Sequence, residues 1–167
     1  MLCAKLSLYL PLELHWVNLS AVPLTILKRR HWAATASICY MHGPAYGAQK
    51  AGLDKFAHDM AVDLRPTGVR SVSIWMGPLI TERSLIAAEV NKEQYEDFLA
   101  TAETPQFIGH ILHTIANDAD GERLSGHTLI AAEITQEYGI TDRDEKQPPS
   151  YREALGSPTP FHPAIIY

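Results

Sequence analysis

The stretch between Pro44 and Trp75 constrains the fold of this 167-residue chain more than any other part. Pro44 stands where the first turn of a helix tolerates proline, and apolar residues then recur at helical spacing as far as Pro66. After a Pro-Thr-Gly stop, a run rich in β-branched residues extends from Val69 to Trp75. The sequence therefore predicts a helix of about five turns followed by a buried strand.

Shorter elements are predicted on both sides of this helix and strand. From composition and periodicity they are a strand at 35–40, helical structure over 82–102 with a helix at 92–101, a helix from 104 onward, and a strand at 127–132. Asn91 and Gln94 resemble a capping box at the start of the helix at 92–101. The order strand, helix, strand, helices, strand predicts an α/β fold with a parallel sheet.

The two ends of the chain differ from the region between them. Residues 1–32 follow neither a strand nor a helix period for long, so we leave them unassigned. Their short apolar start has one early cation, but Pro11 and Glu13 interrupt it, so we expect no signal peptide. Residues 146–167 are rich in proline and are predicted to be an extended or disordered tail. Residues 33–145 then form a single predicted domain.

Composition excludes several classes of partner. The formal net charge is -5, with acidic and basic residues spread along the chain, so no basic face for nucleic acid is expected. No stretch approaches the roughly 20 apolar residues that a membrane-spanning helix needs. Cys3 and Cys39 form no CxxC pair, which favours a reducing, cytoplasmic location. His110 and His113 have no third ligand at a suitable spacing, so no metal site is predicted.

One pair of residues has the chemistry of proton transfer. Tyr46 and Lys50 are separated by one helical turn near the start of the predicted helix, so both project from the same face. A cationic amine beside a phenol stabilises the tyrosinate and brings the phenol pKa closer to neutrality. The same spacing also occurs by chance on ordinary solvated helix faces. The pair alone does not decide between these two interpretations.

Motifs that follow the pair in a fixed order narrow the choice. They are Tyr46-Gly-Ala-Gln-Lys50, Asp63-Leu-Arg-Pro-Thr-Gly, the strand Ser71-Val-Ser-Ile-Trp, and Met76-Gly-Pro-Leu-Ile-Thr81. This succession resembles the catalytic, C-terminal half of the short-chain dehydrogenase/reductase family. Leu124-Ser-Gly-His-Thr-Leu and Glu137-Tyr-Gly-Ile resemble a narrower branch of that family. The resemblance covers residues 33–145 and is strongest as far as Thr81.

The resemblance implies a fold and a set of roles. The fold would be a partial Rossmann-like, doubly wound parallel sheet of about three strands with flanking helices. Tyr46 would be the general acid/base, and Lys50 would bind the nicotinamide ribose and lower the tyrosine pKa. Gly77 and Thr81 would lie beside the nicotinamide of NAD or NADP, and residues 82–102 would form a lid over a small-molecule carbonyl or alcohol substrate. A homo-oligomer is also implied, because family members commonly pack this helix across a dimer interface.

Two departures from the family pattern limit these roles. The position of the catalytic serine falls on Ala33 or Ala34, which cannot hydrogen-bond a carbonyl. No glycine precedes Gly43, so the glycine-rich turn that binds pyrophosphate is missing and at most weak cofactor binding is expected. Three hypotheses remain: a truncated oxidoreductase with little activity alone, a non-catalytic dimerisation or interaction module, and an incomplete gene product.

Overall fold

The computed structural model describes residues 24–28 and 32–166 of the chain. In chain order its strands and longer helices are β1 (Leu24–Lys28), α1 (Pro44–Leu64), β2 (Arg70–Trp75), α2 (Glu82–Val90), α3 (Lys92–Thr101), α4 (Pro105–Asn117), β3 (Thr128–Ile130), α5 (Ala131–Tyr138) and α6 (Arg152–Leu155). Short 3₁₀ turns lie at Trp32–Ser37, Arg65–Thr67, Gly121–Leu124 and Arg143–Glu145. The predicted helix of about five turns and the buried strand that follows it are therefore confirmed as α1 and β2.

The strands form one parallel sheet in the order β1-β2-β3, with β2 in the centre. Ile26 is paired with Val72 on one side of β2, and Ile74 is paired with Leu129 on the other. All six residues of β2 are buried, as a central strand of a parallel sheet requires. The predicted α/β class, with parallel strands flanked by helices, is confirmed.

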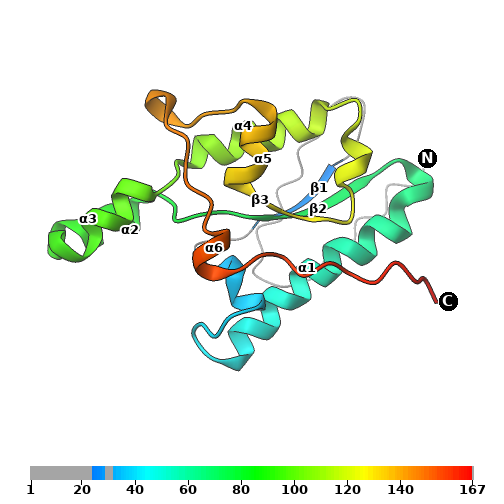
Figure 1. Cartoon of the computed structure of the whole chain (residues 1–167), viewed down its shortest axis with the longest axis horizontal. Coiled ribbons are helices and arrows are strands. Elements are labelled where there is room, and N and C mark those ends of the chain that lie inside the picture. The colour runs from blue at the N-terminus through cyan, green and yellow to red at the C-terminus, as the bar shows by residue number, and fades with distance from the viewer. Residues whose placement is uncertain (1–23, 29–31, 167) are drawn as a thin grey trace.

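Helices cover both faces of the sheet. Figure 1 shows α1 against one face and α4 and α5 against the other. The larger apolar cluster lies between β2 and the α4 side, where Phe107, Ile111 and Ile115 of α4 are fully buried. These residues recur at helical spacing, so a single face of α4 is apolar and packs on the sheet.

Three local predictions need correction. Residues 35–40 do not form a strand, because the amides of Ile38 and Cys39 both donate to the Thr35 carbonyl at 2.9 Å and make a helical turn. The edge of β2 that such a strand would occupy is taken by β1. The strand predicted at 127–132 is shorter, because α5 already begins at Ala131. A capping box exists, but at Thr81 before α2, whereas Asn91 makes no capping bond to α3.

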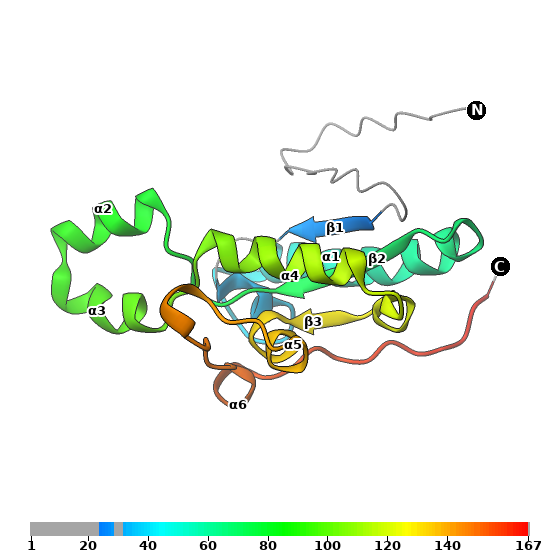
Figure 2. The same cartoon turned by 90° about the horizontal axis from the view of Figure 1, so that it is seen from above.

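Helices α2 and α3 form a pair that extends away from the sheet, as Figure 2 shows. The chain enters this pair after Leu79 and leaves it at Glu103, and these two residues form an isolated parallel bridge. The chain therefore enters and leaves the helical pair at one place. Within the described part of the chain, no helix is long and apolar enough to cross a membrane.

The C-terminal segment contacts α5 and the chain just beyond the end of β2. The Tyr151 hydroxyl donates to the Met76 carbonyl at 3.3 Å, just beyond the end of β2. Arg152 and Ser150 both donate to the Glu133 carboxylate on α5. These contacts join the C-terminal segment to α5 and to the residue that follows β2.

Candidate functional site

Tyr46 and Lys50 are brought together by the first turns of α1. The Lys50 ammonium lies 5.1 Å from the centroid of the Tyr46 ring. Lys50 is only 8% exposed, whereas Tyr46 is half-buried. The His42 ring contacts the Tyr46 ring edge-on, with 5.2 Å between the centroids. The structure thus places a buried cation beside a phenol that solvent can still reach.

Helix α1 is fixed to β2 through a buried carboxylate, Asp54. This side chain accepts hydrogen bonds from the Ser73 hydroxyl at 2.7 Å and from the Trp75 indole nitrogen at 3.1 Å. Figure 1 shows that α1 begins, and β2 ends, at the same end of the sheet. Tyr46 precedes Asp54 by about two turns, or roughly 12 Å of helix, so it lies closer to the start of α1 than this contact with β2.

The two predicted cofactor contacts, Gly77 and Thr81, lie in the turn between β2 and α2. The Gly77 amide donates to Oε2 of Glu103 at 3.0 Å. The Thr81 hydroxyl accepts from the Ser84 amide at 3.2 Å, while the Ser84 hydroxyl accepts from the Thr81 amide at 2.8 Å. These groups therefore make contacts within the chain that the sequence did not predict, and their cofactor roles stay predictions.

Glu103 is the residue of this region that the sequence did not reveal. It is 1% exposed, and burial raises the pKa of its carboxyl from the ordinary 4.5 to about 7. The hydrogen bond from the Gly77 amide opposes this rise, Asp142 contributes to it, and Lys146 has a smaller lowering effect. Glu103 immediately precedes the predicted helix start at Thr104, where a solvated acid would be expected, so no local signal indicated its burial.

Comparison with known proteins decides the family. The chain is 32% identical over 128 residues to human dehydrogenase/reductase SDR family member 1, which covers 71% of this chain and 40% of the relative. It is also 32% identical over 120 residues to the same protein of the mouse, covering 67% of this chain and 38% of that relative. The chain belongs to the short-chain dehydrogenase/reductase family. It spans about 40% of the length of the curated relatives it matches. No family model matches this chain.

Solved structures of this short-chain dehydrogenase/reductase family support the fold. An oxidoreductase of the family from Burkholderia thailandensis matches with a TM-score of 0.51 at 18% identity, covering 72% of this chain and 50% of that one. L-sorbose reductase from Gluconobacter frateurii, complexed with NADPH and L-sorbose, matches with a TM-score of 0.51 at 14% identity, covering 65% and 45%. At these identities the likeness concerns the fold alone.

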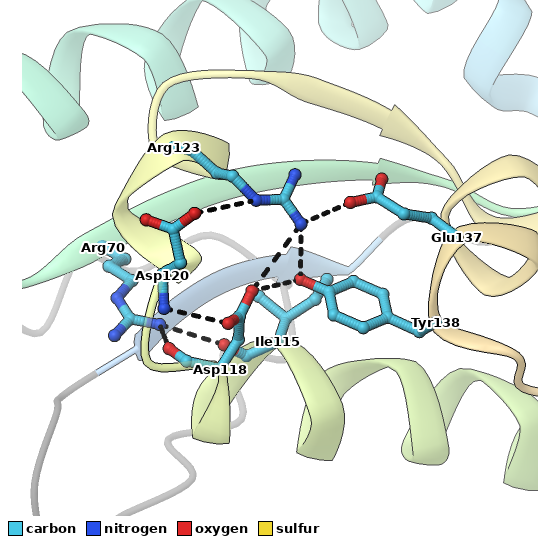
Figure 3. A network of polar contacts seen from close by, with 7 residues as sticks. All are labelled: Arg70, Ile115, Asp118, Asp120, Arg123, Glu137 and Tyr138. Carbon is cyan, nitrogen blue, oxygen red and sulfur yellow. Dashed lines mark hydrogen bonds and ion pairs between the residues drawn. The ribbon is translucent and has the colours of Figure 1, made fainter.

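The start of β2 in this short-chain dehydrogenase/reductase chain holds a different polar cluster, which Figure 3 shows. The buried Arg70 guanidinium donates to the carbonyls of Ile115 and Asp118, at 3.1 and 2.9 Å. The Asp118 carboxylate accepts from the Tyr138 hydroxyl, which lies 3.1 Å from the Arg123 guanidinium. Among residues 24–28 and 32–166, no three side chains gather as a metal site would require.

Proposed function

We propose that this chain carries the proton-transfer part of an NAD(P)-dependent oxidoreductase that interconverts a small-molecule carbonyl and an alcohol. The observation that carries the proposal is the buried Lys50 ammonium, 5.1 Å from the centre of the Tyr46 ring. Membership of the family supports it, and so does the structural relative that was solved with NADPH and L-sorbose.

The chemistry of the pair follows from its electrostatics. A fixed positive charge near a phenol stabilises the phenolate relative to the neutral form. In the reducing direction, Tyr46 Oη would donate its proton to the substrate carbonyl oxygen; in the oxidising direction, the phenolate would accept the alcohol proton. The low exposure of Lys50 matters because water screens a buried charge less than an exposed one.

The described residues fit the nicotinamide and its ribose better than they fit the pyrophosphate of a nicotinamide nucleotide. The Lys50 ammonium and Tyr46 hydroxyl are suitable donors for a ribose, and Gly77 and Thr81 would lie beside the nicotinamide. When bound, that ring would supply or accept the hydride. In the described part of the chain, no strand leads through a glycine-rich turn into a helix, which is the arrangement that binds pyrophosphate. We therefore infer weak cofactor binding and low activity for this chain alone.

The test combines cofactor fluorescence with turnover of a carbonyl panel. NADH and NADPH are titrated into the chain, and their oxidation is then followed with each carbonyl. Any turnover is expected to fall by about 100-fold or more in Tyr46→Phe. Tyr40→Phe is the matched control, because Tyr40 is 89% exposed and should tolerate the change. Turnover that survives Tyr46→Phe would contradict the role of Tyr46, and tight stoichiometric binding would contradict the weak-binding inference.

A non-catalytic self-association module is the second candidate. It is favoured by apolar side chains that α2 exposes, among them Ile86 at 62% and Val90 at 85%. Exposed apolar residues on one helix are typical of surfaces that meet a partner. Light scattering should then detect a dimer, which Ile86→Asp weakens. A monodisperse monomer would rule this candidate out.

A further inference from the structure

Glu103 joins the turn after β2 to the far end of the α2–α3 pair by both its main chain and its side chain. Its amide donates to the Pro78 carbonyl at 2.6 Å, and its carbonyl accepts from the Ile80 amide at 2.9 Å. Its carboxylate accepts from the Gly77 amide at 3.0 Å. One buried residue therefore contacts three positions of the short segment 77–80.

The absence of a side chain at position 77 makes this approach possible. A Cβ atom on Gly77 would lie 2.8 Å from Oε1 and 3.1 Å from Cδ of Glu103. Contacts this short between non-bonded heavy atoms are repulsive, so any larger residue at 77 would displace the carboxyl. The glycine and the glutamate are thus two halves of one packing arrangement.

The charged groups that face the Glu103 carboxyl come from the 142–146 loop. Asp142 is itself held in place, because its carboxylate accepts from the Thr104 amide at 2.7 Å and from the Thr104 hydroxyl. Lys146 directs its ammonium to the carbonyls of Ala100 and Ala102, at 2.5 and 3.3 Å. Within the described residues, no cation forms an ion pair with Glu103.

We propose that Glu103 is a positioning residue for the cofactor-facing turn 77–81, and that its carboxyl holds that turn more firmly when ionised than when protonated. A charged acceptor makes a stronger hydrogen bond to an amide than a neutral one does. The geometry of the contact stands by itself, whereas its consequence for a nucleotide rests on the proposed function. Burial raises the pKa of Glu103 to about 7, so the change of state falls near neutral pH.

The first experiment follows the Gly77 amide by ¹H–¹⁵N NMR of the full chain between pH 5.5 and 8.5, without cofactor. Its chemical shift should titrate with a midpoint near the pKa of Glu103, which is about 7. Glu103→Gln keeps an acceptor oxygen and should remove this titration. Glu96→Gln, an exposed position on α3, is the matched control and should leave it unchanged.

A Gly77 amide that does not titrate, or that titrates equally in Glu103→Gln, would overturn the proposal. Should Glu103→Gln fail to fold, the ¹³C shift of the Glu103 carboxyl in the unmodified chain replaces it. A carboxyl that titrates together with the Gly77 amide supports the proposal, and one that is already ionised at pH 5.5 overturns it.

The second experiment separates this inference from the proposed function. NADPH binding is measured by fluorescence at pH 6 and pH 8, for the unmodified chain and for Glu103→Gln. The unmodified chain should bind several-fold more tightly at pH 8, and the variant should lose this difference. If NADPH does not bind at either pH while Gly77 still titrates, the proposed function fails and the contact between Glu103 and Gly77 stands. Equal pH dependence in both proteins would overturn the effect of Glu103 on the nucleotide.

Discussion

The charged groups near the two ends of strand β2 differ in their partners. At its start, the Arg70 guanidinium donates to two main-chain carbonyls. The Arg123 guanidinium donates to the Tyr138 hydroxyl, which in turn donates to the Asp118 carboxylate (Figure 3). Beyond its other end, the fully buried Glu103 carboxyl has an acidic neighbour in Asp142 and no paired cation among the described residues.

This difference separates a structural cluster from a candidate functional one. The hydrogen bond from Tyr138 lowers the pKa of Asp118, and burial together with Asp118 raises that of Tyr138 to about 12. Both groups therefore keep one charge state across neutral pH. Glu103, with a pKa of about 7, does not. Titration near neutrality is a property that clusters at functional sites, although ion-pair networks also shift pKa values.

The largest effect on stability is expected for the polar cluster at the start of β2. Arg70→Ala removes the donor to one buried and one partly buried carbonyl and leaves a void, so it should lower the free energy of unfolding by about 3 kcal/mol. Urea unfolding at pH 7 measures this loss. Arg83→Ala, on the exposed face of α2, is the control and should change little. A loss for Arg70→Ala no larger than that of the control would remove the distinction between the two ends.

The next effect concerns the pH dependence of stability. The folded pKa of Glu103, about 7, lies above its ordinary value of 4.5. Its contribution to stability is therefore fully present below pH 4.5 and is lost as pH rises through 7. Between these limits the unmodified chain should lose about 2 to 3 kcal/mol relative to Glu103→Gln. If the free energies of unfolding of the two proteins differ by the same amount at pH 5 and at pH 8, the pKa of Glu103 is not raised.

The smallest effect is expected for Tyr138→Phe. This change removes the hydroxyl that donates to Asp118, in a setting that water screens, so the loss of stability at pH 7 should be small and well below that of Arg70→Ala. The pKa of Asp118 is lowered in the folded chain, so this stabilisation is present at neutral pH and is lost as the pH falls through that pKa. Urea unfolding at pH 7 and pH 3 should therefore show a smaller difference between the two proteins in acid.

The sequence could predict those elements whose structure is determined by residues close together in the chain. Helix α1 and strand β2 follow from proline positions and from periodicity, which are properties of neighbouring residues. The strand expected at 35–40 was wrong, because the edge of β2 is occupied by a segment that the sequence left unassigned. The composition of residues 35–40 carries no information on which segment pairs with β2.

The same distinction between neighbouring and distant residues applies to the candidate site. Tyr46 and Lys50 could be identified because one helical turn separates them, and a helix brings such residues together without help from the rest of the chain. Glu103 contacts Gly77 across 26 positions of sequence, and its burial depends on how the α2–α3 pair returns to the sheet. Only a three-dimensional structure places those two residues side by side.

The bridge between Leu79 and Glu103 has a consequence for how such a chain can evolve. Because the polypeptide leaves the sheet and returns to it at neighbouring positions, residues 82–101 form an insertion whose two ends are already joined. Loops of this kind can be lengthened, shortened or exchanged at a small cost in chain entropy. Related chains can therefore differ in this helical pair while α1 and its tyrosine stay where they are.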